Sequence, residues 1–163
     1  MKQTKLEIDQ EIVRKVALGA LKFSYLKFSP RPNIVFDLEQ SVSLDGDSGP
    51  YVQYTFARIQ SVLKKSKEAE DNFEELGIEK YEREVLRQLL YFQEIVETAA
   101  FGLHPNLLTE YLINLSRLYN LFYQKCRIIG SEKESFRVKI SKETGKVLQK
   151  GLYLLGVSAP ERM

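Results

Sequence analysis

The sequence is poor in the residues that many enzymes use for metal binding and covalent chemistry. It contains one cysteine, Cys126, one histidine, His104, and no tryptophan. A single cysteine excludes a disulfide within the chain, and a single histidine excludes a metal site or an acid–base pair built on two histidines. Glycine-rich phosphate-binding motifs are absent as well. We therefore expect no catalytic residues and no bound cofactor in this chain.

Both scarce residues have structural interpretations. His104 lies in a Gly-x-His-Pro sequence, which predicts a turn between two helices. Cys126 falls on the apolar side of a predicted helix, and no nearby base in the sequence is suited to activate its thiol. We expect a buried structural thiol there.

Long apolar runs are missing too. No stretch approaches the ~20 residues that a transmembrane helix needs, and residues 1–10 lack the apolar core of a signal peptide. The length of 163 residues, with 44% hydrophobic and 28% charged residues, is typical of a globular protein. We expect a chain without a membrane segment, in the reducing cytoplasm.

The net charge of +2 hides an asymmetry along the chain. Residues 1–103 carry 14 Lys and Arg against 17 Asp and Glu, whereas residues 104–163 carry 10 against 5. The basic final third is compatible with a polyanionic partner, although solvated helix faces produce similar biases.

Apolar periodicity predicts an all-α chain, an antiparallel helical bundle. A first helix precedes the Ser29-Pro-Arg-Pro32 sequence, and residues 33–38 are extended or lead into a short helix. The loop at 44–50, with two glycines and a proline, is the best domain boundary. Four further helices are expected, at 51–67, 81–101, 106–127 with Asn106 as N-cap, and 135–155, with a connection at 68–77. Strand is expected only around Val35, if anywhere.

Two aromatic groups are candidates for contact with RNA. Tyr51 and Tyr54 are three residues apart on one helix face, with Arg58 one turn beyond Tyr54. The second group is the sequence Tyr-Asn-Leu-Phe-Tyr at 119–123, with Lys125 and Arg127 following. Tyrosine rings can stack on unpaired bases, and an arginine can hold a phosphate. The alternative is ordinary half-buried packing with extended cationic side chains.

Several segments, taken in order, resemble arginyl-tRNA synthetases. They are residues 16–26 and 35–38, the Tyr-Val-Gln-Tyr segment within 49–59, His104-Pro with Tyr111-Leu, the Tyr-Asn-Leu-Phe-Tyr at 119–123, Arg137, and the run at 151–163 that ends Ala-Pro-Glu-Arg-Met. Two departures keep the size of the family's residues: Thr55-Phe56 stands for Ala-His, and Tyr119 for Phe.

The resemblance implies a C-terminal part of an arginine–tRNA ligase, an ATP-dependent class I enzyme. Residues 49–163 would form its helical anticodon-binding domain, and residues 1–48 the tail of the catalytic side with a linker. Arginine tRNA and the enzyme's own catalytic domain would be the partners of a monomer, with ATP and magnesium bound only by that catalytic domain. The implied RNA-binding residues are Tyr51, Tyr54, Arg58, Tyr119, Asn120, Tyr123 and Met163.

The sequence allows two other interpretations. Lys139-Ile-Ser-Lys142 is similar to part of the Lys-Met-Ser-Lys-Ser loop of class I synthetases, but it falls within a predicted helix, and a single histidine cannot supply the His-x-Gly-His partner motif. A helical adaptor that binds proteins, with no role in nucleic-acid binding, would use the same amphipathic helices.

Overall fold

Seven α-helices make up the part of the chain that the computed structural model describes, residues 9–29, 33–66 and 77–163. The helices are α1 (Gln10–Leu26), α2 (Leu38–Val42), α3 (Gly49–Lys65), α4 (Lys80–Leu90), α5 (Phe92–Gly102), α6 (Pro105–Lys125) and α7 (Glu134–Leu154). These residues contain no strand, and Val35, where a short strand was possible, is an exposed coil residue. The predicted all-α class is confirmed.

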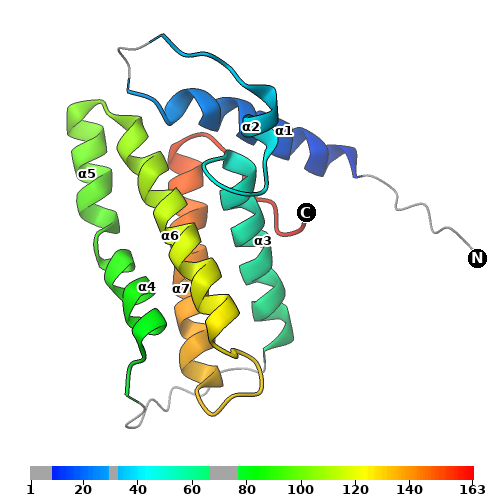
Figure 1. Ribbon diagram of the computed structural model, residues 1–163, viewed down its shortest axis with the longest axis vertical. Helices are drawn as coiled ribbons and strands as arrows, with labels where there is room; N and C mark the ends of the chain where they lie inside the picture. The colour runs from blue at the N-terminus through cyan, green and yellow to red at the C-terminus, as the bar shows by residue number, and fades with distance from the viewer. Residues whose placement is uncertain (1–8, 30–32, 67–76) are drawn as a thin grey trace, which may run out of the picture.

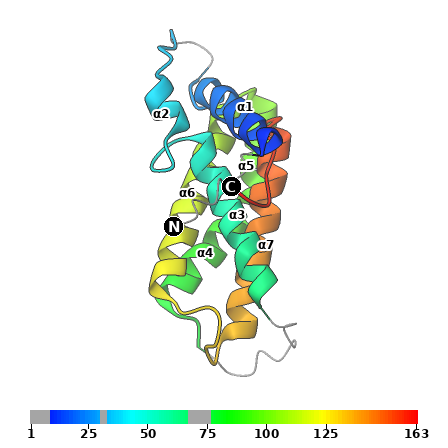
Figure 2. The same cartoon turned by 90° about the vertical axis from the view of Figure 1, so that its right-hand side faces the viewer.

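The helices form a bundle of long, neighbouring elements (Figure 1). Helix α3 packs against α6 and α7, and α4 and α5 pack one after the other along α6. Helix α1 crosses the end of this bundle and packs on α3, with the short α2 on its outer side (Figure 2). Phe23 of α1 is fully buried and belongs to the same core as the later helices.

Local chemistry fixes where the helices begin. Asp9 accepts hydrogen bonds from the backbone at the start of α1, and Ser48 accepts one from the N–H of Tyr51 at 3.1 Å at the start of α3. In α4, Glu79 and Glu82 form a capping box. The predicted loop at 44–50 is confirmed up to Ser48, because Gly49 already belongs to α3.

The prediction of a single helix at 81–101 is wrong in one respect, because the structure has two helices there, α4 and α5, separated at Tyr91. The hydroxyl of Tyr111 donates a hydrogen bond to the carbonyl of Gln88 at 2.9 Å, and the N–H of Tyr91 reaches the same carbonyl in a tighter turn. The apolar periodicity runs on across this break, so sequence alone does not reveal it.

The predicted N-cap at Asn106 is also wrong. Helix α6 begins at Pro105, with His104 in the N-cap position. Proline suits the first turn of a helix because its missing N–H would have no partner there. The turn expected around His104 is confirmed, between α5 and α6. The connection expected at 68–77 falls outside the described residues, apart from Gly77.

Helix α7 ends in a tail that turns back towards the bundle. Gly156 takes the left-handed conformation, with φ of 67°. The N–H of Val157 donates to Leu152 and that of Gly156 to Tyr153, both at 2.9 Å, which completes a Schellman motif. The tail then returns alongside α3 (Figures 1 and 2).

Candidate RNA-binding site

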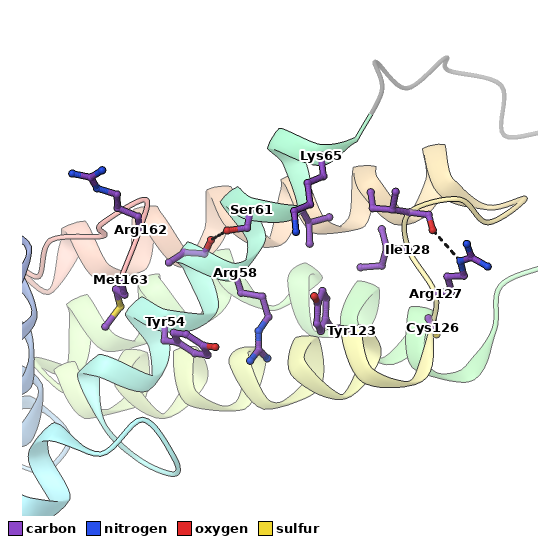
Figure 3. A pocket seen from close by; sticks show the side chains of 13 residues that line it. Tyr54, Arg58, Ser61, Lys65, Tyr123, Cys126, Arg127, Ile128, Arg162 and Met163 are labelled. Carbon is purple, nitrogen blue, oxygen red and sulfur yellow. Dashed lines mark hydrogen bonds between the residues drawn. The ribbon is translucent and has the colours of Figure 1, made fainter. Parts of the chain in front are cut away.

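A hollow of about 690 Å³ lies where α3, the end of α6, the loop after α6 and the tail meet. Figure 3 shows its lining side chains around a central arginine. The residues that line it are Tyr54, Ala57, Arg58, Ser61, Val62, Lys65, Tyr123, Cys126, Arg127, Ile128, Ile129, Arg162 and Met163. Four of them are cations and none has an acidic side chain, so the hollow suits a polyanion. The guanidinium group of Arg162 pairs with Asp9 at 2.8 Å and points away from the hollow in Figure 3, which leaves Arg58, Lys65 and Arg127 as its cations without an ion-pair partner among the described residues.

Arg58 lies between two tyrosine rings at the centre of the hollow (Figure 3). The centre of its guanidinium group is 4.8 Å from the ring centroid of Tyr54 and 5.1 Å from that of Tyr123. Both distances are within the range of cation–π attraction. The two rings come from different helices, α3 and α6, so the arginine joins them into one aromatic and cationic surface.

The buried side-chain amide of Asn120 fixes this arginine on the side that faces the bundle. Nη1 of Arg58 donates to Oδ1 of Asn120 at 2.5 Å. The Nδ2 group of Asn120 donates to the hydroxyl of Tyr51 at 3.1 Å and to Oγ1 of Thr55 at 3.0 Å. The arginine is thus connected to the body of α3 and α6 by a chain of hydrogen bonds.

The loop after α6 forms one wall of the hollow. Cys126 and Ile128 point into the core and are each 5% exposed, whereas Arg127 is exposed. Burial raises the pKa of the Cys126 thiol, which keeps it protonated. The buried thiol predicted at this position is confirmed, although it caps α6 and does not lie within the helix.

An ion-pair network fixes the backbone of that loop. Nη1 of Arg137 donates to the carbonyl of Arg127 at 2.9 Å, and its other nitrogens donate to Glu82 and Glu79. A hydrogen bond from Lys133, with help from nearby positive charge, lowers the pKa of Glu79, and the same hydrogen bond raises the pKa of Lys133.

The tail forms the opposite wall, and contacts with α1 hold it. Nζ of Lys22 donates to the carbonyl of Gly156 at 2.5 Å. The amide of Gln53, a fully buried residue of α3, donates to the carbonyl of Ser158 at 2.7 Å and to that of Lys15 in α1 at 3.2 Å. These contacts set the place from which Met163 reaches the hollow.

The structure brings together most of the candidate residues. Tyr54, Arg58, Tyr123 and Met163 all line the hollow. The side chain of Tyr51 is half-buried outside this lining, with its hydroxyl on Asn120.

Two candidates lie beneath this surface. Tyr119 is fully buried, and its hydroxyl donates to Ser141 at 3.1 Å, so it has no surface to offer a base. This burial removes it from the set of candidate contacts. Asn120 is 7% exposed and supports Arg58 from below.

Sequence reasoning missed other cations of the hollow. Lys65 follows Arg58 by seven residues, which places both on one face of α3, so helical spacing could have found it. Arg162 has no such signal, because its place depends on how the tail folds back.

The expected helical position of Lys139–Lys142 is confirmed within α7.

The described ranges contain no helix long and apolar enough to cross a membrane. Nor do they bring three or more His, Cys, Asp or Glu side chains together in a possible metal site.

The all-helical fold agrees with the families that these residues match. The family described as DALR anticodon binding domain matches residues 52–163, and the chain belongs to it. Among curated relatives, it is 36% identical over 160 residues to the arginine–tRNA ligase of Flavobacterium psychrophilum, covering 93% of this chain, and 39% identical over 166 residues to that of Streptococcus suis, covering 99%.

Solved structures agree with this assignment. The arginyl-tRNA synthetase of Thermus thermophilus matches with a TM-score of 0.86 at 34% identity, over 94% of this chain. That of Plasmodium falciparum matches with a TM-score of 0.85 at 26% identity, over 97%. The chain spans 26% and 29% of the length of the two curated relatives, and 28% and 29% of the two solved chains.

Proposed function

We propose that this chain is the C-terminal part of an arginine–tRNA ligase and binds the anticodon arm of arginine tRNA. The observation that carries the proposal is the sandwich of Tyr54, Arg58 and Tyr123 in a hollow whose lining includes further cations and no acidic side chain. It combines the two interactions that an RNA loop offers, the faces of unpaired bases and the charges of phosphates.

The chemistry of the hollow favours single-stranded RNA over a duplex. Tyr123 is 42% exposed, and the bases of a duplex are already stacked on each other, so an exposed tyrosine ring gains most from a base that has left its stack. Lys65 and Arg127 lie at the exposed rim, where they can reach phosphates while a base lies on the ring.

The flexible thioether of Met163, 44% exposed, supplies an adaptable apolar contact for the same loop. It comes from the tail and lies at the end of the hollow opposite Arg127 (Figure 3).

The division of the chain at Gly49 is part of the proposal. Helix α3 starts there, and the family match starts three residues later, at Val52. Residues 33–48 present a series of exposed apolar side chains to solvent. They are Val35, Phe36, Leu38, Val42 and Leu44. Such a patch suits a protein partner, and we assign it to the catalytic domain of the same enzyme.

In this scheme the chain positions the tRNA, and the chemistry occurs elsewhere in the enzyme. The catalytic domain would use ATP, with magnesium, to activate arginine and transfer it to the tRNA. We also propose that the enzyme works in the cytoplasm as a monomer.

A filter-binding titration tests the proposal. The 163-residue chain is titrated against arginine tRNA and against an RNA duplex of equal length, at several salt concentrations. We expect tighter binding of the tRNA, with an affinity that falls as salt rises, because phosphate contacts release counterions. Arg58→Ala should weaken binding of the tRNA more than binding of the duplex.

The opposite result would favour the adaptor function. Equal and weak affinity for both RNAs, unchanged by Arg58→Ala, would show that the hollow does not bind an RNA loop. The apolar surfaces of the chain would then be the better guide to its partner.

A further inference from the structure

Asn120 is a buried side chain with an unusual set of partners. It is 7% exposed and reaches from α6 to α3, where it contacts Arg58, Tyr51 and Thr55. Each of its polar atoms has a hydrogen-bond partner within the protein. Both of its N–H hydrogens are used within the protein, its oxygen already accepts from Arg58, and its burial keeps it from direct contact with an RNA base.

The orientation of its amide group is dictated by Thr55. The hydroxyl of Thr55 donates its single hydrogen to the carbonyl of Tyr51 at 2.9 Å. Towards Asn120 it can then only accept, so the NH2 group of the amide must face Thr55. The carbonyl oxygen is left pointing at the guanidinium group of Arg58.

This oxygen determines where Arg58 lies. An arginine side chain has many rotamers, and a half-buried one beside a hollow can otherwise extend into solvent. The hydrogen bond from Nη1 to Asn120, at 2.5 Å, holds the guanidinium group at the level of the two tyrosine rings. Nε and Nη2 of Arg58 make no hydrogen bond to any residue that the structure describes, and they remain available to a ligand.

We infer that Asn120 is a positioning residue for RNA binding, which touches no RNA and acts through Arg58. The inference rests on the proposed function. Its physical basis is preorganisation: if the arginine is already fixed, binding does not have to order it. Loss of the amide should weaken binding about 2- to 13-fold, the range for ordering one side chain rich in rotamers.

A double-mutant cycle tests the inference. Affinity for arginine tRNA is measured by filter binding for the full chain and for the variants Asn120→Ala, Arg58→Ala and the two combined. If Asn120 acts through Arg58, the combined variant should bind no more weakly than Arg58→Ala alone.

A matched control comes from the preceding residue. Tyr119→Phe also removes one buried hydrogen bond from α6, the one to Ser141, but it leaves Arg58 untouched. It should lower thermal stability without changing affinity for the tRNA. A purely structural role of Asn120 would make the two variants behave alike.

A second variant covers the case in which Asn120→Ala does not fold. Thr55→Val removes the acceptor that orients the amide. It should weaken binding in the native background and have no effect in the Arg58→Ala background.

The outcomes separate this inference from the proposed function. Additive losses in the cycle, or full affinity in a folded Asn120→Ala, would overturn the positioning role while leaving RNA binding by Arg58 intact. Absence of any tRNA binding would overturn both.

Discussion

Nε of Arg137 donates to Oε1 of Glu82 at 2.8 Å, and the two side chains are 8% and 0% exposed. This pair joins the first turn of α7 to the first turn of α4. The same guanidinium group also holds the carbonyl of Arg127 in the wall of the hollow. One buried charge thus supports both the packing of the bundle and the shape of the candidate site.

Arg137→Ala should lower the free energy of unfolding by ~3–5 kcal/mol, because it removes the nearer cation from the fully buried carboxylate of Glu82 and leaves only Lys133, at 3.6 Å, beside it. The measurement is urea denaturation followed by circular dichroism. Lys146→Ala is the matched control, since it breaks a solvent-exposed pair with Glu143 on the same helix. The control should change stability by less than ~1 kcal/mol. Equal effects of the two substitutions would contradict the structural role of the buried pair.

Leu115→Ala should cost ~2–5 kcal/mol of stability, because it empties a fully buried site in α6. Leu89 of α4 is also apolar but is only half-buried, beside a shallow apolar groove. Leu89→Ala should therefore cost less than ~2 kcal/mol. Chemical denaturation of both variants measures the two losses of stability. A larger loss of stability for Leu89→Ala than for Leu115→Ala would show that the buried faces are assigned wrongly.

The helices and their buried faces were largely predictable from sequence. Apolar side chains repeat at helical spacing, and this repeat predicts core positions such as Leu112 and Phe122, which are buried in the structure. The break at Tyr91 was not predictable in this way, because the hydrogen bond that accompanies it comes from Tyr111, which is 20 residues away in the chain. A contact between segments that are distant in the chain does not change the local spacing of apolar residues, so it cannot be predicted from that spacing.

The candidate site was predictable only in part. Tyr54 and Arg58 are one turn apart, so the sequence itself places them together. The sequence could not distinguish Tyr119 from Tyr123, which are also one turn apart, although the first is buried and the second exposed. Which of the two faces inward is decided by how α6 packs on α7, and that depends on the whole bundle.

Alkaline pH should destabilise the chain through its buried tyrosines. Burial raises the pKa of Tyr111 and of Tyr119 above the ordinary value of ~10. A raised folded-state pKa means that the stabilisation is fully present below pH ~10 and is lost as pH rises towards the folded-state pKa. Each tyrosine contributes a slope of at most ~1.4 kcal/mol per pH unit in that window.

Urea titrations between pH ~9 and ~11 measure this slope. Tyr119→Phe should reduce the slope of unfolding free energy against pH by the contribution of one tyrosine, because the other titrating groups are unchanged. An identical pH dependence in the wild-type chain and in Tyr119→Phe would contradict the assignment.

The stacking surface should dominate the affinity for RNA. Tyr54→Ala or Tyr123→Ala should weaken binding of arginine tRNA by ~1–3 kcal/mol for each base stack lost. Tyr153→Ala is a suitable control, because that tyrosine is 78% exposed and does not line the hollow. Filter binding at fixed salt makes the comparison, and an effect of Tyr153→Ala as large as that of Tyr123→Ala would argue against a stacking site.

Hydroxyl-radical footprinting of arginine tRNA bound to the 163-residue chain tests the central claim most directly. The claim is that the hollow around Tyr54, Arg58 and Tyr123 receives the anticodon arm. We expect protection confined to the anticodon loop and the adjoining stem, and its loss with Tyr123→Ala. Protection at the acceptor end of the tRNA, or an anticodon loop that is cleaved as in free tRNA at saturating protein, would contradict the claim.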